Sequence, residues 1–596
     1  MARALSSSFL LLAAGSLAAC FAGAGPEGGD AEESEDELRF RAGVVDTTLP
    51  EVDAVGYDIE LAVTDAPGRE TFRAAVKGSY VATEDLTELS LDFAGNTIDD
   101  VTVSGRRAEH RREGDRLVVK LPQRVAKGRR FTTRVAYHGQ VTQADGADPN
   151  DFAAFGGFMV KQKNSENKRI YTSLSWPSKA RRWLPLRDHP RDVAEVAFTV
   201  TWPKSFTVLA NGKRVGTTDN PDGSKTWRYE ALTPMPTYDF HVSAYESWKQ
   251  GESRSESNVP IATYAYARTA SRASSVYGDV PKVLDFYEAK FGKYRWGSLA
   301  FIEEPIFGGG MEHASVVSMD ETLFPDPREA RSTAFHELAH HWSGNLVHVR
   351  TWNDFWLSEG FTEYLTARAI AHVDGPAAGK RVYREYLTST LAADRANPHA
   401  LAPAGAEIDV LSIFDAIPYQ KGALTVRMLE RIVGEPEMTA FIKGWFDRHG
   451  FGKGVTTDDL QRELEEASGK DLSGFFATFV RGGYHPELRV TFAPAGGETE
   501  LRVEQLQSQG PAGGFLFPLD LDLVDDAGRA ERVTVELTGK TTTKRVRTAR
   551  APRSVVVDPD EYAIAVTACG QSGGGECKAD YRCAPQRAGV SACVPR

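Results

Sequence analysis

A short string in the middle of the chain, HELAH followed later by WLSE, places the strongest constraint on the fold. His336 and His340 are four residues apart, Glu337 follows the first of them, and Glu359 lies further along the chain. On a helix, residues four apart share one face, so both imidazoles can point at one metal ion. The pattern therefore predicts a helix that carries two metal ligands and a carboxylate base.

The surrounding residues favour a buried site. Residues 334–341 are apolar at several positions and contain no glycine or proline, and residues 343–345 (SGN) are typical of a helix end. Glu359 lies within the apolar segment 355–361, where a charge needs a partner because an unpaired buried charge is costly. Two core histidines and a locally paired glutamate are the alternative interpretation.

The residue types indicate a catalytic rather than a structural metal site. Two histidines, one carboxylate and one open position form a common catalytic zinc shell, whereas structural zinc sites are usually closed and rich in cysteine. The five cysteines lie near the chain ends, at Cys20, Cys569, Cys577, Cys583 and Cys593. We therefore expect one Zn²⁺ per chain on His336, His340 and Glu359, with Glu337 as general base.

Further motifs occur in a fixed order along the chain. They are ARRWLPLRDHP at residues 180–190, GGMEH at 309–313, YQKG at 419–422 and GYHP at 483–486. With the HExxH helix, they resemble the A-R-x-x-x-P-x-x-D-x-P, G-x-M-E-N and Y-x-K-G motifs of zinc metallopeptidases of the aminopeptidase N family, which includes leukotriene-hydrolysing relatives. GYHP falls where such proteins turn from helices into a small β domain. The resemblance spans about residues 50–567.

The resemblance implies a role for each matching residue. Glu312 would hold the free N-terminal ammonium of a peptide, because a carboxylate beside the zinc is its natural counter-charge. The backbone at Gly309, Gly310 and Met311 would bind the peptide closely, as an added strand. Tyr419, with an unperturbed pKa of about 10, stays protonated at neutral pH and would donate a hydrogen bond to the oxyanion.

Two residues depart from the family pattern. Trp176 stands where relatives usually carry Gln or Glu, and an indole donates a hydrogen bond but accepts none from an ammonium. His313 replaces the Asn of G-x-M-E-N; it could keep a hydrogen bond or, if protonated, would weaken the attraction for an ammonium. The expected function is zinc-dependent release of N-terminal residues from peptides. A zinc endopeptidase or dipeptidase, and a surface peptide-binding protein without turnover, are the alternatives.

The first fifty residues predict export. Residues 1–19 contain a charged start and an apolar run too short to span a bilayer, as in a secretory signal. Their end, with Cys20, resembles the lipobox of bacterial lipoproteins, in which the cysteine carries the lipid; an ordinary small-residue cleavage site is the alternative. Residues 20–50 are typical of an acidic flexible tether. We expect an exported protein, lipid-anchored to a bacterial membrane in the periplasm or at the cell surface.

The rest of the chain predicts an α+β multidomain protein. Residues 51–246 show strand patterns and resemble the family's β-rich N-terminal domain. Residues 247–484 are mostly helical and, by resemblance, form a thermolysin-like zinc catalytic domain, while residues 485–567 alternate as in a small β-sandwich. Residues 568–596 carry four cysteines that are expected to form two disulfides, with a zinc knuckle as the alternative.

The charge of the chain bears on its partners. The formal net charge is -12 over 596 residues, and no basic domain or stripe stands out. We therefore expect no nucleic-acid partner. The expected partners are peptide substrates and a lipid bilayer reached through the lipid anchor.

Overall fold

The computed structural model describes residues 40, 46–146, 148, 151, 155–568, 577, 581–587 and 590–595. The expected signal peptide, Cys20 and most of the expected tether lie outside these residues. No helix in the described part of the chain combines the length and apolar character that a membrane crossing needs.

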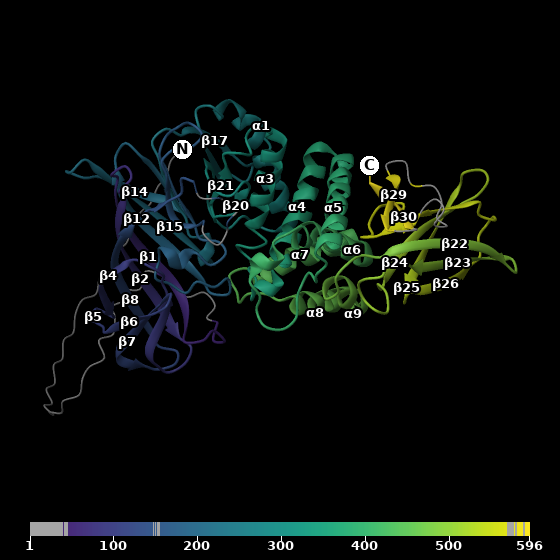
Figure 1. Cartoon of the computed structure of the whole chain (residues 1–596), viewed down its shortest axis with the longest axis horizontal. Coiled ribbons are helices and arrows are strands. Elements are labelled where there is room, and N and C mark those ends of the chain that lie inside the picture. The colour runs from purple at the N-terminus through teal and green to yellow at the C-terminus, as the bar shows by residue number, and fades with distance from the viewer. Residues whose placement is uncertain are drawn as a thin grey trace, which may run out of the picture. The chain divides into compact units, whose positions relative to one another are not determined.

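The first part of the described chain is built from β-sheets (Figure 1). An eight-stranded sheet has the order β14 (Lys213–Asp219), β15 (Ser224–Pro236), β12 (Val193–Pro203), β1 (Val52–Thr64), β2 (Thr71–Ala82), β8 (Arg130–Gln140), β4 (Thr97–Val103), β5 (Arg106–Arg107). A five-stranded sheet follows the order β13 (Thr207–Ala210), β16 (Val242–Tyr245), β11 (Ile170–Leu174), β10 (Gly157–Lys161), β9 (Thr142–Gln143), and a third sheet joins β3 (Leu86–Asp92), β7 (Arg116–Val125) and β6 (His110–Glu113). The core follows from the alternation along β12, where Phe198, Val200 and Trp202 are buried and the intervening Thr199 and Thr201 are partly exposed.

The second part of the described chain begins with a mixed five-stranded sheet. Its order is β17 (Lys249–Arg254), β18 (Pro260–Ala265), β19 (Leu299–Glu304), β21 (Val316–Asp320) and β20 (Gly310–Met311). The short strand β20 is antiparallel to β21 and forms one edge of the sheet. The edge of this sheet therefore carries the GGMEH motif.

Helices make up most of the chain after this sheet. They are α1 (Ala273–Tyr277), α2 (Val280–Phe291), α3 (Pro327–His340), α4 (Trp356–Asp374), α5 (Pro376–Ala396), α6 (Gly422–Val433), α7 (Glu435–His449), α8 (Thr457–Ser468) and α9 (Ser473–Phe475). The apolar faces of α4, α5 and α6 pack into one core with α2 and α3. Local sequence fixes several ends: Thr456 and Asp459, for example, form a capping box at the start of α8.

The last part is a sandwich of two sheets. The larger follows the order β26 (Thr541–Val546), β23 (Glu498–Gln505), β22 (Glu487–Ala495), β28 (Val566–Ala568), β30 (Val590–Pro595), β29 (Tyr581–Arg587); the smaller contains β25 (Ala530–Leu537), β24 (Phe517–Val524) and β27 (Ser554–Val557). The predicted α+β multidomain class is thus confirmed.

The cysteine-containing tail is part of this sandwich. Strand β30 pairs with β28, so the segment 568–596, which the sequence analysis set apart, continues the larger sheet. A disulfide joins Cys577 to Cys593 and so uses two of the four thiols that a zinc knuckle would need. Cys569 lies outside the described residues.

Candidate active site

Helix α3 carries the HExxH residues and begins at a well-defined cap. The Asp326 side chain accepts hydrogen bonds from the backbone N–H groups of Arg328 and Glu329, and Pro327 occupies the first helical position. Toward the other end of the helix, Glu337 is 4% exposed and His340 1% exposed. The helix therefore directs its last polar turn into the protein interior.

Helix α4 supplies the third residue of the predicted metal site. Glu359 lies in its first turn and is 5% exposed. The neighbouring Gly360 packs against the backbone of Gly422, and a β-carbon added at Gly360 would lie 2.8 Å from Gly422 Cα. This close approach brings the turn before α6, which contains Tyr419, next to the metal-binding end of α4.

The structure brings the three predicted ligands together. His336 Nε2 lies 3.0 Å from His340 Nε2, and Glu359 Oε2 lies 3.3 Å and 3.2 Å from these two nitrogens. Ligands about 2.0–2.1 Å from a tetrahedral Zn²⁺ are separated from each other by roughly 3.3 Å. Glu359 Oε2 also has no hydrogen-bond partner among the described residues, although it is buried. The donor types and their spacing thus fit a zinc ion.

Groups behind the ligands fix their orientation. His340 Nδ1 contacts the carbonyl oxygen of Ser343 at 2.9 Å, which leaves Nε2 as the free nitrogen. Glu363 Oε1 lies 3.7 Å from His336 Nδ1 on the far side of that ring. Burial alone would raise the pKa of Glu359, but the two imidazoles beside it outweigh this effect and lower the pKa to about 2.

Two further carboxylates face the same position. One donor atom each of Glu312, Glu337 and His340 lie within 4.8 Å of one another. Burial raises the pKa of Glu337 to about 8, with Glu312 and Glu359 adding to the rise and both histidines opposing it. Glu312 is 6% exposed, and burial also raises its pKa. The two carboxyl groups therefore lie on the same side of the metal site, and burial favours their neutral forms unless a cation beside them favours the charged forms.

Tyr419 lies over the first imidazole. Its ring stacks on His336 with centroids 6.3 Å apart and meets the edges of Phe355 and Phe414 at 5.7 Å. Burial raises the Tyr419 pKa well above its usual value, so the hydroxyl remains a donor at neutral pH. Lys421, the lysine of the same motif, donates to Asp394 of α5 at 2.8 Å and holds the turn in place.

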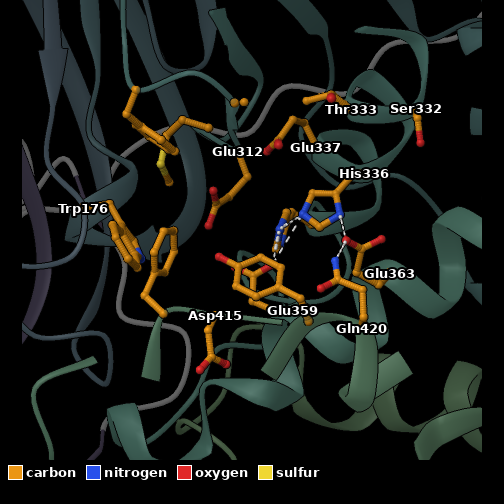
Figure 2. A pocket seen from close by; sticks show the side chains of 17 residues that line it. Trp176, Glu312, Ser332, Thr333, His336, Glu337, Glu359, Glu363, Asp415 and Gln420 are labelled. Atoms are coloured by element: carbon orange, nitrogen blue, oxygen red, sulfur yellow. Dashed lines mark hydrogen bonds and ion pairs between the residues drawn. The ribbon is translucent and has the colours of Figure 1, made fainter. Parts of the chain in front are cut away.

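A cavity of about 390 Å³ lies in front of these groups. Gly309, Gly310 and Met311 line it together with the ligands, Glu312, Glu337 and Tyr419. Figure 2 shows Glu312 and Trp176 across the cavity from His336. The cavity thus has polar groups at the metal site and an aromatic wall at Trp176, whose ring lies 5.2 Å from that of Phe414.

The two residues that depart from the family pattern, Trp176 and His313, lie in different places. Trp176 lines the cavity, whereas His313 is fully buried and does not. Burial and the nearby His241 lower the His313 pKa well below its usual value, so this side chain is neutral at pH 7. His313 therefore brings no positive charge that would repel an ammonium at Glu312.

Two residues near the cavity were not predicted from the sequence. Glu363 lines it beside His336, and Asp239 is fully buried with no hydrogen-bond partner for either carboxylate oxygen among the described residues. Burial raises the Asp239 pKa well above its usual value, and the charges of Glu312 and Glu337 raise it further. No local pattern marks Asp239, because it reaches the site from the β-rich part of the chain.

Two imidazoles and a carboxylate with a separate carboxylate base on an HExxH helix are the donor set of a zinc metallopeptidase. Comparison with known families agrees: residues 54–238 match the Peptidase M1 N-terminal domain and residues 277–479 match the Peptidase family M1 domain. The chain belongs to peptidase family M1.

Individual relatives are distant in sequence. The chain is 26% identical over 573 residues to aminopeptidase N of Streptomyces lividans, an alignment that covers 89% of this chain and 63% of that protein. It is 27% identical over 405 residues to leukotriene A-4 hydrolase of Xenopus laevis, covering 64% and 63%, and 28% identical over 344 residues to human glutamyl aminopeptidase, covering 55% and 36%. The chain thus spans less than two thirds of the length of these relatives.

Proposed function

We propose that this protein is a zinc-dependent aminopeptidase that releases N-terminal residues from peptides. The observation that carries the proposal is the position of Glu312, whose carboxylate lies within 4.8 Å of donor atoms of Glu337 and His340. An anion so close to the metal site leaves room for about one residue between the peptide N-terminus and the bond that is cleaved. Aminopeptidase N and glutamyl aminopeptidase among the relatives support this activity.

His336, His340 and Glu359 would hold one catalytic Zn²⁺, which supplies Lewis acidity toward the peptide carbonyl and lowers the pKa of a water molecule. Glu337 accepts the proton of the attacking water and passes it to the leaving amine. Burial raises the pKa of Glu337, and a cation bound beside it would lower this pKa and favour the carboxylate form that accepts a proton.

The remaining groups position the peptide. Glu312 pairs with the N-terminal ammonium and sets the position of cleavage. The edge strand β20, Gly310–Met311, offers backbone groups with which an extended peptide pairs as an added strand. Tyr419 donates a hydrogen bond to the oxyanion that forms when water adds to the carbonyl.

We further propose that the protein is exported and lipid-anchored through Cys20 to a bacterial membrane, with residues 20–50 as tether. The lipobox-like end of the signal supports this proposal. The disulfide between Cys577 and Cys593 agrees with an oxidising compartment outside the cytoplasm. A Cys20→Ser variant tests the anchor: we expect it in the soluble fraction after cell lysis, and its retention in the membrane fraction would exclude lipidation at this residue.

The hydrolytic function is tested with a panel of aminoacyl-nitroanilides. We expect the full chain to cleave them, to lose activity with a chelator and to regain it when zinc is restored. Glu337→Gln is expected to bind zinc at the catalytic site but to lose turnover, because the proton acceptor is gone. If the protein holds zinc at this site but cleaves none of the panel, a peptide-binding protein without turnover becomes the favoured function.

A further inference from the structure

A second group of metal-ligand side chains lies outside the active-site cavity. It consists of His241, just before β16, Glu304 at the end of β19, and His313, two residues after β20. All three are 0% exposed, and none of them lines the cavity at the catalytic site. We call them the buried triad. One member comes from the β-rich part of the chain and two from the catalytic part.

The free atoms of the buried triad face one another. One donor atom from each residue lies within 4.8 Å of the other two, and His241 Nε2 is 3.4 Å from Glu304 Oε1. Among the described residues, His241 Nε2, Glu304 Oε1 and His313 Nε2 all lack a hydrogen-bond partner. Three buried polar atoms without partners in one place are costly unless another group binds them.

The other polar atom of each side chain is already engaged. His241 Nδ1 lies 2.9 Å from the carbonyl oxygen of Ser173, which is its nearest contact, and Ser318 Oγ lies 2.8 Å from His313 Nδ1. Glu304 Oε2 accepts a hydrogen bond from Ser243 Oγ at 2.6 Å. Outer contacts of this kind orient the ligands of protein metal sites and leave the inner atom free.

A hydrogen bond within the triad does not account for this arrangement. A carbonyl oxygen only accepts, so His241 Nδ1 carries the proton and, in the neutral ring, Nε2 is an acceptor that faces an acceptor of Glu304. The 3.4 Å separation is also longer than an ordinary N–H···O bond, but it is close to the roughly 3.3 Å between two ligands of one tetrahedral zinc ion.

Charge leads to the same conclusion. Among the described residues, no lysine or arginine forms an ion pair with Glu304, and the only basic side chain within 4.0 Å of its carboxylate is the neutral imidazole of His241. A buried carboxylate needs a compensating positive charge. A divalent cation supplies this charge and three ligand bonds at once.

We propose that His241, Glu304 and His313 bind a second divalent transition-metal ion, of the class that includes Zn²⁺. Two imidazoles and one carboxylate suit Zn²⁺ and its neighbours better than Mg²⁺ or Ca²⁺. The two rings stack with centroids 4.0 Å apart and planes 17° apart, so one ring turns out of the stack when both bind the same ion. Because His313 follows Glu312 directly, the ion fixes the backbone beside that carboxylate.

Counting bound zinc tests the proposal without relying on activity. The full chain, purified with a tag that contains no histidine and with its disulfides oxidised, is stripped with a chelator, loaded with Zn²⁺, desalted and analysed for zinc per chain. We expect two ions in the wild type and one in His336→Gln/His340→Gln. Adding His241→Gln to that double variant leaves none, whereas adding His348→Gln, at another buried histidine, leaves one. One ion in the wild type and none in the double variant would overturn the proposal, as would an ion that persists after His241→Gln.

A second measurement, anomalous diffraction, uses the wild type and so does not require that any variant folds. Crystals of the zinc-loaded wild type are expected to give two anomalous peaks at the zinc absorption edge, one of them between His241, Glu304 and His313, with the imidazole stack opened. A peak at the catalytic site alone, or a second peak away from these side chains, contradicts the proposal. Either result is independent of whether the protein cleaves free-amine substrates.

Discussion

The backbone of Gly310 lies directly against the carboxylate of Glu337: a β-carbon added at residue 310 would lie 2.3 Å from Glu337 Oε1. Such a distance is not tolerated, so any side chain at this position displaces the proposed base. The same glycine belongs to the edge strand that we propose binds the peptide backbone. Gly310 therefore links the proposed peptide-binding strand to the proposed base.

We predict that Gly310→Ala lowers kcat by about 10²-fold, because a displacement of about 1 Å in a catalytic group has an effect of this size. Zinc content is expected to stay the same, because Glu337 is not a ligand. Steady-state kinetics with metal analysis checks both points. The matched control is Gly309→Ala, whose added carbon would lie 3.6 Å from Phe307, an ordinary contact. Equal losses in the two variants would refute a specific clash with Glu337.

Tyr419→Phe removes one hydroxyl next to the metal site. We expect kcat to fall by about 10²–10³-fold, the usual cost of losing one oxyanion donor, with zinc content unchanged. Tyr245→Phe serves as control, because this buried tyrosine donates to Glu166 at 2.8 Å, outside the cavity. A Tyr419→Phe enzyme as fast as this control would show that the hydroxyl plays no part in catalysis.

A buried ion pair supports the turn that carries Tyr419. Lys421 and Asp394 are both 0% exposed, and Asp394 also contacts His485 Nδ1 at 2.9 Å. Asp394→Asn leaves the lysine charge unpaired, which costs about 3–5 kcal/mol, so we expect a melting temperature several degrees lower.

The exposed pair Lys443–Asp447 provides the comparison, since surface pairs are worth at most about 1 kcal/mol. Asp447→Asn is expected to change the melting temperature little. If Asp394→Asn melts like Asp447→Asn in thermal scans, the buried pair does not stabilise the fold.

The pH dependence of stability is predicted to depend in part on His348. Burial lowers its pKa to about 4 in the folded chain, against an ordinary value of 6.5. Between these values the unfolded chain binds a proton that the folded chain does not, so stability falls as the pH drops from 6.5 toward 4. At pH 5 this loss amounts to about 2 kcal/mol.

His348→Gln removes this titration. We therefore expect the fall in melting temperature between pH 7.5 and pH 5 to be smaller in this variant than in the wild type. His110→Gln, at an exposed histidine, is expected to match the wild type. A fall in His348→Gln as large as in the wild type would mean that other groups account for the acid sensitivity.

Local patterns were sufficient to predict one part of the site. The spacing of His336 and His340 fixes their common face on a helix, and the apolar setting of Glu359 implies a buried partner. The role of Lys421 could not be predicted from its motif, because its partner Asp394 lies 27 residues away on another helix. In the same way, His241 meets Glu304 and His313 only where two different sheets pack together, because β16 belongs to one sheet and β19 and β20 to another. This leaves no short-range pattern.

The position of His313 also could not be predicted from the sequence. Its place in the GGMEH motif suggested a side chain at the substrate amine, and its charge there depended on its protonation. In the fold it points away from the cavity and is neutral, because burial lowers its pKa. Adjacent residues on an extended segment face opposite sides, so the side chains of Glu312 and His313 lie in different surroundings.

The proposed aminopeptidase specificity depends on Glu312 more than on any other residue of the site. The most direct test compares kcat/KM of the zinc-loaded full chain for each aminoacyl-nitroanilide with that for its N-acetylated counterpart. We expect a preference for the free amine of at least about 10²-fold, which is lost in Glu312→Gln because the buried charge partner is missing. Equal cleavage of free and acetylated substrates by the wild type would contradict the claim and indicate an endopeptidase.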